Sequence, residues 1–82
     1  TFKNQIDVNV TNNNGVTPLH LAAYGGHLNI VKFLVNYPNV DINKTDDIGS
    51  TPFNYAGNSR QVISFLGTFP GIDVNHQNFA GI

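Results

Sequence analysis

The sequence predicts an all-α protein in which short helices are arranged as stacked repeats. The first observation is a repeat: IDVNVTNNNGVTPLHLAA at residues 6–23 returns as VDINKTDDIGSTPFNYAG at residues 40–57. The second is that both copies place threonine and proline after a turn glycine, which is a helix-start signal. The third is an apolar segment at residues 28–37 whose polar residues form one narrow stripe, so that this helix needs neighbours on most sides.

The repeat extends along the whole chain. NIVKFLVNYPNVDIN at 29–43 is echoed by QVISFLGTFPGIDVN at 61–75, and IDVNHQNFAGI at 72–82 begins another copy. The chain therefore divides into the end of one repeat (1–10), a first full repeat (11–43), a second, shortened repeat (44–75) and the start of a further repeat (76–82). This division predicts further repeats on both sides in the parent chain, because few repeats are stable alone.

The first repeat opens with a turn and a short helix. The segment NNNG at 12–15 is a turn whose glycine can take positive φ at little cost. Thr17 is placed to cap a helix with its hydroxyl, and Pro18 occupies the first helical position, where its missing N–H costs nothing. The helix is expected over residues 18–24, because the two glycines at 25–26 supply a left-handed cap and a turn.

The second helix of this repeat is expected over residues 28–37, since Pro38 disfavours helical backbone in the residue before it. Its polar positions fall at helical spacing on one side: Asn29, Lys32 and Asn36. Its other positions are apolar, and stacked repeats would cover them: Leu28, Ile30, Val31, Phe33, Leu34 and Val35.

The second repeat replays these elements with departures. Its first helix follows a turn at 46–49 and is expected to start at Thr51 and Pro52. The loss of two residues should shorten or distort this helix. Asn58 and Gln61 have the spacing of a capping box at the start of the next helix. The polar stripe recurs at Gln61, Ser64 and Thr68, whereas Arg60 and Gly67 replace apolar residues, and Pro70 limits this helix as Pro38 does the earlier one.

Composition excludes several classes of function. The formal net charge of −1 gives no reason to expect nucleic acid or an anionic membrane as partner. No apolar run approaches the roughly 18–20 residues of a membrane-spanning helix, so no membrane insertion is expected. The chain has no cysteine, which excludes disulfides and thiolate metal sites and fits a reducing compartment; an intracellular, cytoplasmic location is expected.

The residues that could carry chemistry do not form a recognisable site. A metal site needs convergent ligands, and the histidines lack an HExxH companion: His20, His27 and His76. No serine lies on a nucleophile elbow: Ser50, Ser59 and Ser64. The Asp41–Asp47 alternation fails as a calcium loop, because Asp46 and Pro52 stand where glycine and glutamate are needed. We expect no enzyme activity, no metal and no cofactor.

Asn9 and Asn43 lie in glycosylation sequons at equivalent places in the two repeats. The preference of the turn for asparagine explains both equally well.

The segment GVTPLHLAAYGGHLNIVKFLVNYPNVDIN resembles the ankyrin repeat, whose signature joins Thr-Pro-Leu-His to a Gly-His and an Ile-Val-x-x-Leu-Leu helix. The resemblance covers essentially the whole chain and is weakest at TPFNYA in the second repeat. It implies antiparallel helix pairs stacked into a solenoid, with β-hairpin-like loops projecting at roughly right angles. It also implies that His20 hydrogen-bonds backbone around the Thr-Pro turn and in the neighbouring repeat, and that His27 lies at the junction of the two helices.

The resemblance implies a protein–protein interaction module that offers a rigid scaffold to a protein partner. The partner would contact the loop tips and the concave helix face, which by position are Thr11, Asn13, Asn14, Val16, Tyr24, Thr45, Asp47, Ile48, Ser50, Gln77 and Phe79. Tyr24, Ile48 and Phe79 have the most apolar area to bury. Alternatively the repeats are a targeting arm of a larger enzyme or secreted microbial effector, a structural spacer, or a fragment that self-associates. With two complete repeats, we expect the isolated chain to be marginally stable.

Overall fold

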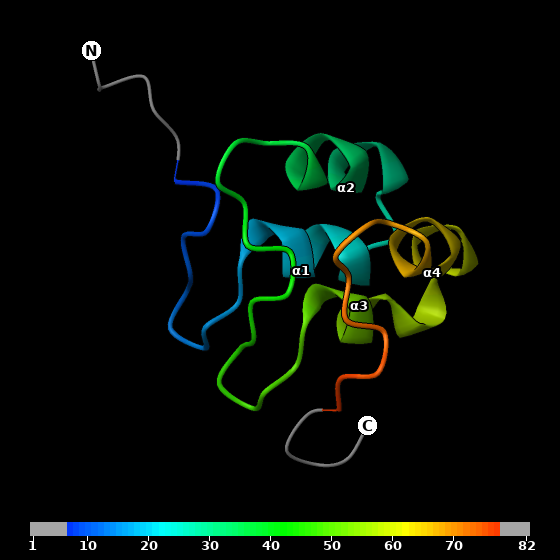
Figure 1. Ribbon diagram of the computed structural model, residues 1–82. Coiled ribbons are helices and arrows are strands. Elements are labelled where there is room, and N and C mark those ends of the chain that lie inside the picture. The colour runs from blue at the N-terminus through cyan, green and yellow to red at the C-terminus, as the bar shows by residue number, and fades with distance from the viewer. Residues whose placement is uncertain (1–6, 78–82) are drawn as a thin grey trace.

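The computed structural model describes residues 7–77, and in this range it contains two helix pairs and no β-strand (Figure 1). This confirms the predicted all-α fold class. The first pair is α1 (Pro18–Tyr24) and α2 (Leu28–Val35). The second pair is α3 (Pro52–Tyr55), continued by a 3₁₀ turn at Ala56–Asn58, and α4 (Arg60–Gly67). The repeat boundaries assigned from the sequence stay a prediction.

Helix α1 starts and stops where the sequence predicts. The Thr17 hydroxyl accepts from the His20 backbone N–H (3.3 Å), while the Thr17 N–H donates to His20 Nδ1 (3.0 Å). This is a capping box in which histidine takes the role usually held by glutamate or glutamine. At the other end Gly25 keeps a right-handed φ of −79°, and Gly26, with φ of 72°, is the left-handed residue that turns the chain.

Helix α2 ends two residues earlier than predicted. Asn36 caps it, and the Asn36 side-chain amide donates to the Lys32 carbonyl at 2.9 Å, which satisfies a carbonyl of the last turn. Among the described residues the helix is also less covered than its sequence suggests. Val31 is fully buried, whereas Ile30 and Phe33 are 50% and 63% exposed, so the described repeats leave this face uncovered and its coverage by further repeats stays a prediction.

The second pair confirms a shortened first helix. Helix α3 has four residues, because the chain passes into the 3₁₀ turn where the first repeat continues as regular helix. The predicted capping box of Asn58 and Gln61 is wrong: Asn58 belongs to the 3₁₀ turn, and the Ser59 hydroxyl caps α4 by accepting from the Val62 N–H at 3.3 Å. Ser59 is the counterpart of His27, the residue before α2, so both helices start at equivalent positions.

The core forms where the two pairs stack. Helix α1 packs against both α2 and α3, and α2 and α3 each contact α4. Ala23 and Ala56 are fully buried at these crossings, where a small side chain lets the backbones approach. Burying a leucine such as Leu19 or Leu66 contributes about 1.5–3 kcal/mol. The loops before α1 and α3 project together away from the helices, at the lower left of Figure 1.

Candidate functional site

The two projecting loops have the same hydrogen-bonded turn. Asn12 Oδ1 accepts from the N–H groups of Asn14 and Val16 at 2.8 and 3.1 Å. In the second repeat Asp46 Oδ1 accepts from the N–H groups of Ile48 and Ser50 at 3.1 and 2.8 Å. Backbone bonds close each turn, from Asn12 N to the Val16 carbonyl and from Asp46 N to the Ser50 carbonyl. These loops are hairpin-like, as expected, although no strand is formed.

A backbone bond also joins the two loops, since the Asp47 N–H donates to the Asn14 carbonyl at 3.0 Å. The glycine of the first turn has a positive φ of 76° at Gly15, and a Cβ there would lie 2.7 Å from Asp47 Oδ1. Only glycine therefore permits the adjacent tips to approach this closely. The two loop tips therefore form one continuous surface.

Most residues predicted to contact a partner are exposed: Thr11, Asn13, Asn14, Tyr24, Thr45, Asp47, Ile48 and Gln77. Two are not. Val16 and Ser50 are 9% and 4% exposed, because each lies at the inner end of a turn, where its N–H is bonded back to the first residue of that turn. Phe79 lies outside the described residues.

Tyr24 and Ile48, two of the residues with most apolar area to offer, line one hollow. It has a volume of about 390 Å³ and is also lined by Asn54, Tyr55, Gly57 and Asn58. The hollow opens between the C-terminal end of α1, the second loop and α3 with its 3₁₀ turn. Tyr24 and Ile48 are 69% and 58% exposed, so both can lose much apolar area to a partner.

Tyr55 occupies the place that Leu21 has in the first repeat, and sequence reasoning missed it as a site residue. Its ring meets the Tyr24 ring edge-on, with centroids 6.2 Å apart and planes at 73°. It meets the His20 ring in the same way at 4.7 Å. The Tyr55 hydroxyl donates to Asp46 Oδ2. The signal in the sequence was a paired change, in which Asn12 and Leu21 of the first repeat become Asp46 and Tyr55.

The Asp46 carboxylate is 9% exposed and accepts three hydrogen bonds. Burial acts to raise its pKa, but the bonds from Tyr55, Ser50 and Ile48 outweigh burial and hold the pKa below the usual value. Burial and the bond to Asp46 raise the pKa of Tyr55 to about 12. At neutral pH the pair is therefore an ionised carboxylate with a neutral phenol donating to it.

His20 connects the two repeats, as the resemblance implied. Because Nδ1 accepts from Thr17 N, the ring proton lies on Nε2, which donates to the Ser50 carbonyl at 2.8 Å. Burial lowers the pKa of His20, against the opposing effects of the Ser50 carbonyl and of Asp46. Asn54 forms the two equivalent bonds in the second repeat. Its Oδ1 accepts from Thr51 N at the start of α3, and its Nδ2 donates to the His76 carbonyl in the next loop at 3.1 Å.

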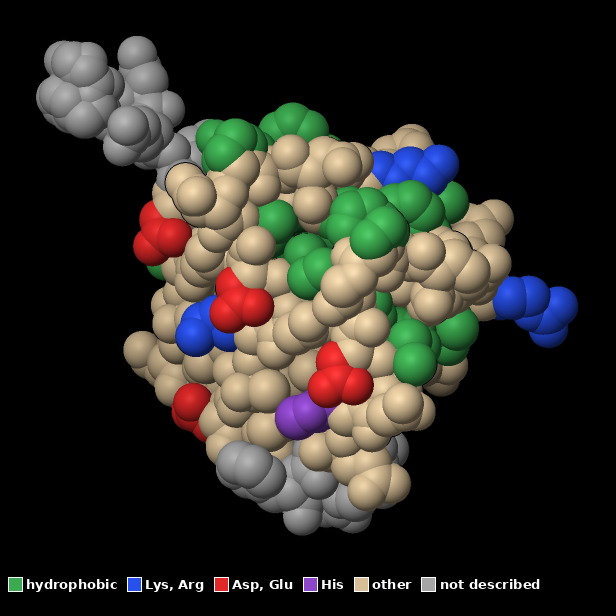
Figure 2. All heavy atoms as spheres, in the orientation of Figure 1, with side chains coloured by type: hydrophobic (Ala, Val, Ile, Leu, Met, Phe, Trp, Pro, Cys, Tyr) green, Lys and Arg blue, Asp and Glu red, His purple; other side chains and the backbone are tan. Residues whose placement is uncertain are grey.

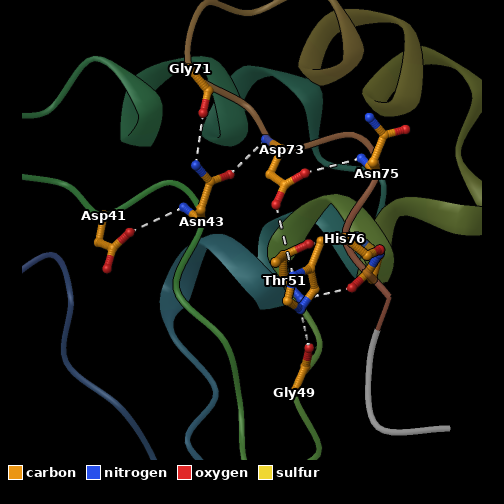
Figure 3. Close-up of polar contacts among 9 residues, drawn as sticks. Asp41, Asn43, Gly49, Thr51, Gly71, Asp73, Asn75 and His76 are labelled. Atoms are coloured by element: carbon orange, nitrogen blue, oxygen red, sulfur yellow. Dashed lines mark hydrogen bonds and ion pairs between the residues drawn. The ribbon is translucent and has the colours of Figure 1, made fainter. Parts of the chain in front are cut away.

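A second set of bonds links the repeats beyond α2 and α4 (Figure 3). Asn43 Nδ2 donates to the Gly71 carbonyl at 2.7 Å, and Asn43 Oδ1 accepts from Asp73 N at 3.0 Å. Asn9 forms the equivalent two bonds with Asn39 and Asp41, so this pattern follows the repeat. His76, to which the sequence assigned no role, donates from Nε2 to the Gly49 carbonyl at 2.7 Å. These contacts hold the loops in fixed register.

Charge is distributed unevenly between loops and helices. All five acidic residues lie outside the helices: Asp7, Asp41, Asp46, Asp47 and Asp73. Of the described cations, Lys32 and Arg60 lie on α2 and α4, and Lys44 lies in a loop. In Figure 2 acidic side chains lie at the left and centre of the face in view, with a Lys or Arg side chain beside them at the left, and further cations lie at the upper right and far right. The loop side of the described chain is thus negative.

Within residues 7–77 no group of three or more His, Cys, Asp or Glu side chains could hold a metal ion. In the same range no helix is long and apolar enough to cross a membrane. A second, more apolar hollow of about 260 Å³ lies beside the first loop and is lined by Val10, Thr11, Asn12, Val16, Pro18 and Leu21.

Helix pairs that stack through a shared core, with interlocked loops along one side, define a helical-repeat protein of the solenoid class. A sequence model of the family described as ankyrin repeats (many copies) matches residues 1–56. The chain belongs to the ankyrin-repeat family. Ankyrin repeats generally act as protein–protein interaction modules.

The chain is also similar to segments of much longer proteins. It is 44% identical over 50 residues to human ankyrin repeat domain-containing protein SOWAHB, which is 61% of this chain and 6% of that protein. It is 42% identical over 50 residues to putative glutaminase 2 of Caenorhabditis elegans, 61% of this chain and 8% of that protein. It is 38% identical over 55 residues to alpha-latrocrustotoxin-Lt1a of Latrodectus tredecimguttatus, 67% of this chain and 4% of that protein. The match thus spans less than a tenth of each of these relatives.

Proposed function

We propose that this chain is a non-catalytic protein-binding segment of a longer ankyrin-repeat protein. The partner docks in the hollow at Tyr24, Ile48 and Tyr55, and the loop tips form the polar rim around it. The observation that carries this proposal is the convergence of two strongly exposed apolar side chains, Tyr24 at 69% and Ile48 at 58%, on one hollow of about 390 Å³. A concave surface with aromatic anchors and a polar rim is typical of protein-binding sites.

The fixed geometry of the loops supports the same proposal. Binding is weakened by the entropy lost when mobile loops and side chains become ordered, so a surface that is already ordered binds more tightly. Here His20 bonds the first repeat to the Ser50 carbonyl, and the Asp47 N–H bonds the second loop to Asn14. The Tyr55 hydroxyl is fixed by its hydrogen bond to the Asp46 carboxylate. Little of the hollow has to be ordered when a partner arrives.

The rim is assigned from the exposed residues of the predicted contact set. These are Thr11, Asn13, Asn14, Thr45, Asp47 and Gln77. Val16 and Ser50 are left out of the contact surface because they are buried, and they act by holding the turns. We assign the rim residues to orientation and water exclusion, and the hollow to most of the affinity.

The test is partner capture by the immobilised chain followed by mass spectrometry, with matched variants. The double variant Tyr24→Ala, Ile48→Ala should lose at least about tenfold in recovery of a partner that the unchanged chain captures, because hot-spot truncations cost about 2 kcal/mol or more. Phe33→Ala is the control, since Phe33 is 63% exposed on α2, away from the hollow. Undiminished capture by the double variant would remove the hollow from the proposal. Loss in the Phe33 variant alone would move the binding surface to α2.

A second candidate function is that of a targeting arm for a larger enzyme or effector whose activity lies outside this chain. The similarity to short segments of a putative glutaminase and of a latrocrustotoxin favours it, because the repeat then accompanies different named proteins. Sequencing the complete gene tests this candidate: a catalytic or toxin domain beside the repeats would support it, and a chain of ankyrin repeats alone would exclude it.

We also propose an intracellular, cytoplasmic site of action, in which the two sequons stay unmodified. The side-chain nitrogens that would carry the glycans already donate to neighbouring carbonyls, from Asn9 to Asn39 and from Asn43 to Gly71. Intact-mass measurement of the chain expressed in its own cell would test this, and a glycan on either asparagine would overturn it.

A further inference from the structure

Tyr55 can act only as a hydrogen-bond acceptor toward anything that enters the hollow. Its hydroxyl has one hydrogen, and that hydrogen is donated to Asp46 Oδ2. The remaining lone pairs of the phenol oxygen are made more basic by the carboxylate behind it. Asn54, which also lines the hollow, has its amide oxygen engaged by Thr51 N and one of its two amide hydrogens donated to the His76 carbonyl. A ligand group that brings its own donors therefore suits the Tyr55 oxygen best.

The same hollow offers aromatic faces. Tyr24 is 69% exposed and meets Tyr55 at a centroid distance of 6.2 Å. The face of a tyrosine ring carries partial negative charge, which attracts a cation within about 6 Å. A planar guanidinium stacks on such a ring more readily than an ammonium does, because it is less strongly hydrated.

The charges around the hollow also favour a cationic ligand group. None of its six lining residues carries a charge: Tyr24, Ile48, Asn54, Tyr55, Gly57 and Asn58. Ile48 directly follows Asp46 and Asp47, and Asp46 bonds directly to Tyr55. No described lysine or arginine lines the hollow, although Arg60 begins the helix after Asn58. An incoming anion would be repelled by Asp46 and Asp47, which one lysine of the same loop, Lys44, offsets only in part, whereas a cation would be attracted to them.

We propose that the hollow binds an arginine side chain of the protein partner, with the guanidinium against the Tyr24 ring and an N–H donated to the Tyr55 oxygen. The inference rests on the proposed function, since it names the chemistry of the group that docks at the same hollow. A neutral apolar side chain would fill the space but would leave the phenol oxygen without a donor, and its burial would gain nothing from the acids.

The test is an amide chemical-shift titration of the 82-residue chain with three capped tripeptides that differ only in the central residue: arginine, citrulline or leucine. Citrulline has nearly the shape of arginine and no charge, so the comparison isolates the charge. The arginine peptide should shift the amide signals of Ile48, Tyr55 and Asn58 and bind about two- to fivefold more tightly than the other two, as cation–π attraction at an exposed site implies.

Variants separate a specific site from general attraction. Tyr24→Leu keeps an apolar side chain but removes the aromatic face, and it should reduce the preference for arginine over citrulline by the part that the ring supplies. Phe33→Leu makes the same change at an equally exposed ring on α2 and should leave the preference intact. Asp46→Asn should reduce the preference, and it should still fold, because Asn12 forms the same turn in the first repeat.

The outcomes distinguish the two proposals. If leucine binds at these amides as tightly as arginine, the arginine inference is overturned and the hollow remains a docking site. If arginine shifts only signals of the acidic loops and leaves Tyr55 and Asn58 unmoved, the attraction is general and the inference is also overturned. If no peptide shifts these amides while the capture experiment still depends on Tyr24 and Ile48, the arginine inference is overturned and the hollow remains a docking site for other chemistry.

Discussion

Removing the Tyr55 hydroxyl is the sharpest perturbation of the site, because it deletes one bond and keeps the ring. In Tyr55→Phe the Asp46 carboxylate loses one of its three donors and keeps the N–H groups of Ile48 and Ser50. A hydrogen bond to a charged group contributes about 1.5–3 kcal/mol. Tyr55 is only partly buried, so water replaces part of the lost bond. We therefore expect a loss of about 1–2 kcal/mol of unfolding free energy.

The assay is reversible denaturation of the chain and its variants by urea, followed by circular dichroism. For a domain of this size, about 1 kcal/mol corresponds to a shift of roughly 4–8 °C in Tm, so thermal melts provide a second readout. Tyr24→Phe is the matched control, since the Tyr24 ring is 69% exposed, and its loss of a hydroxyl should change stability by less than about 0.5 kcal/mol.

A double-mutant cycle with Asp46→Asn isolates the bond between the two side chains. The pair should show a coupling free energy of about 1 kcal/mol, because neighbouring partners in one network are not additive. The double replacement Asp46→Asn with Tyr55→Leu gives the second repeat the side chains of Asn12 and Leu21, and it should recover part of the loss. A coupling indistinguishable from zero would refute the reasoning that Asp46 holds Tyr55 in place.

Two further predictions concern pH, and one concerns the whole chain. The pKa of His20 is lowered in the folded state, so the contribution of His20 to stability is present above pH 6.5 and is lost as pH falls through the folded-state pKa. The variant His20→Asn, which copies the Asn54 cap, should flatten the plot of unfolding free energy against pH in this range. An unchanged slope in urea denaturation at several pH values would contradict this. The pKa of Tyr55 is raised from 10.0 to about 12, so the stabilisation that Tyr55 provides is lost as pH rises between these values. Absorbance titration should find one tyrosine with a pKa of about 12, and this pKa should move toward 10 in Asp46→Asn. The isolated 82-residue chain should melt below about 60 °C or self-associate, and a cooperative melt of a monomer above that temperature would contradict this.

Local signals in the sequence were enough to place helix α1. Its start depends on Thr17 and Pro18 and its stop on Gly25 and Gly26, all of which act on their immediate neighbours. The end of α2 was less predictable. Pro38 sets only the latest residue at which the helix can end, whereas the bond from the Asn36 side chain to the Lys32 carbonyl ends it earlier.

The second repeat shows where local signals compete. Asn58 and Gln61 have capping-box spacing, but Ser59 lies next to Asn58 and can also cap. In the structure Asn58 is the last residue of the 3₁₀ turn that follows α3, and Ser59 caps α4. Spacing alone could not decide between the two caps.

The resemblance to the family predicted the residues of the proposed contact surface in outline, and it did not predict the pair formed by Asp46 and Tyr55. Exposure at Tyr24 and Ile48 follows from their positions at a helix end and a loop tip. The bond between Asp46 and Tyr55 spans a turn and a helix start, so it requires the side-chain directions of both elements. Comparing the two repeats position by position would have suggested the pair, because Asn12 and Leu21 change together.

Cross-saturation in a complex tests the central claim most directly. The labelled chain would be bound to a partner recovered by capture, and saturation transferred from the partner would be measured at each described residue. The account predicts strong transfer at Tyr24, Ile48 and Tyr55, weaker transfer at the loop tips, and none at Phe33. Transfer concentrated on α2 and α4, with the hollow unaffected, would contradict it.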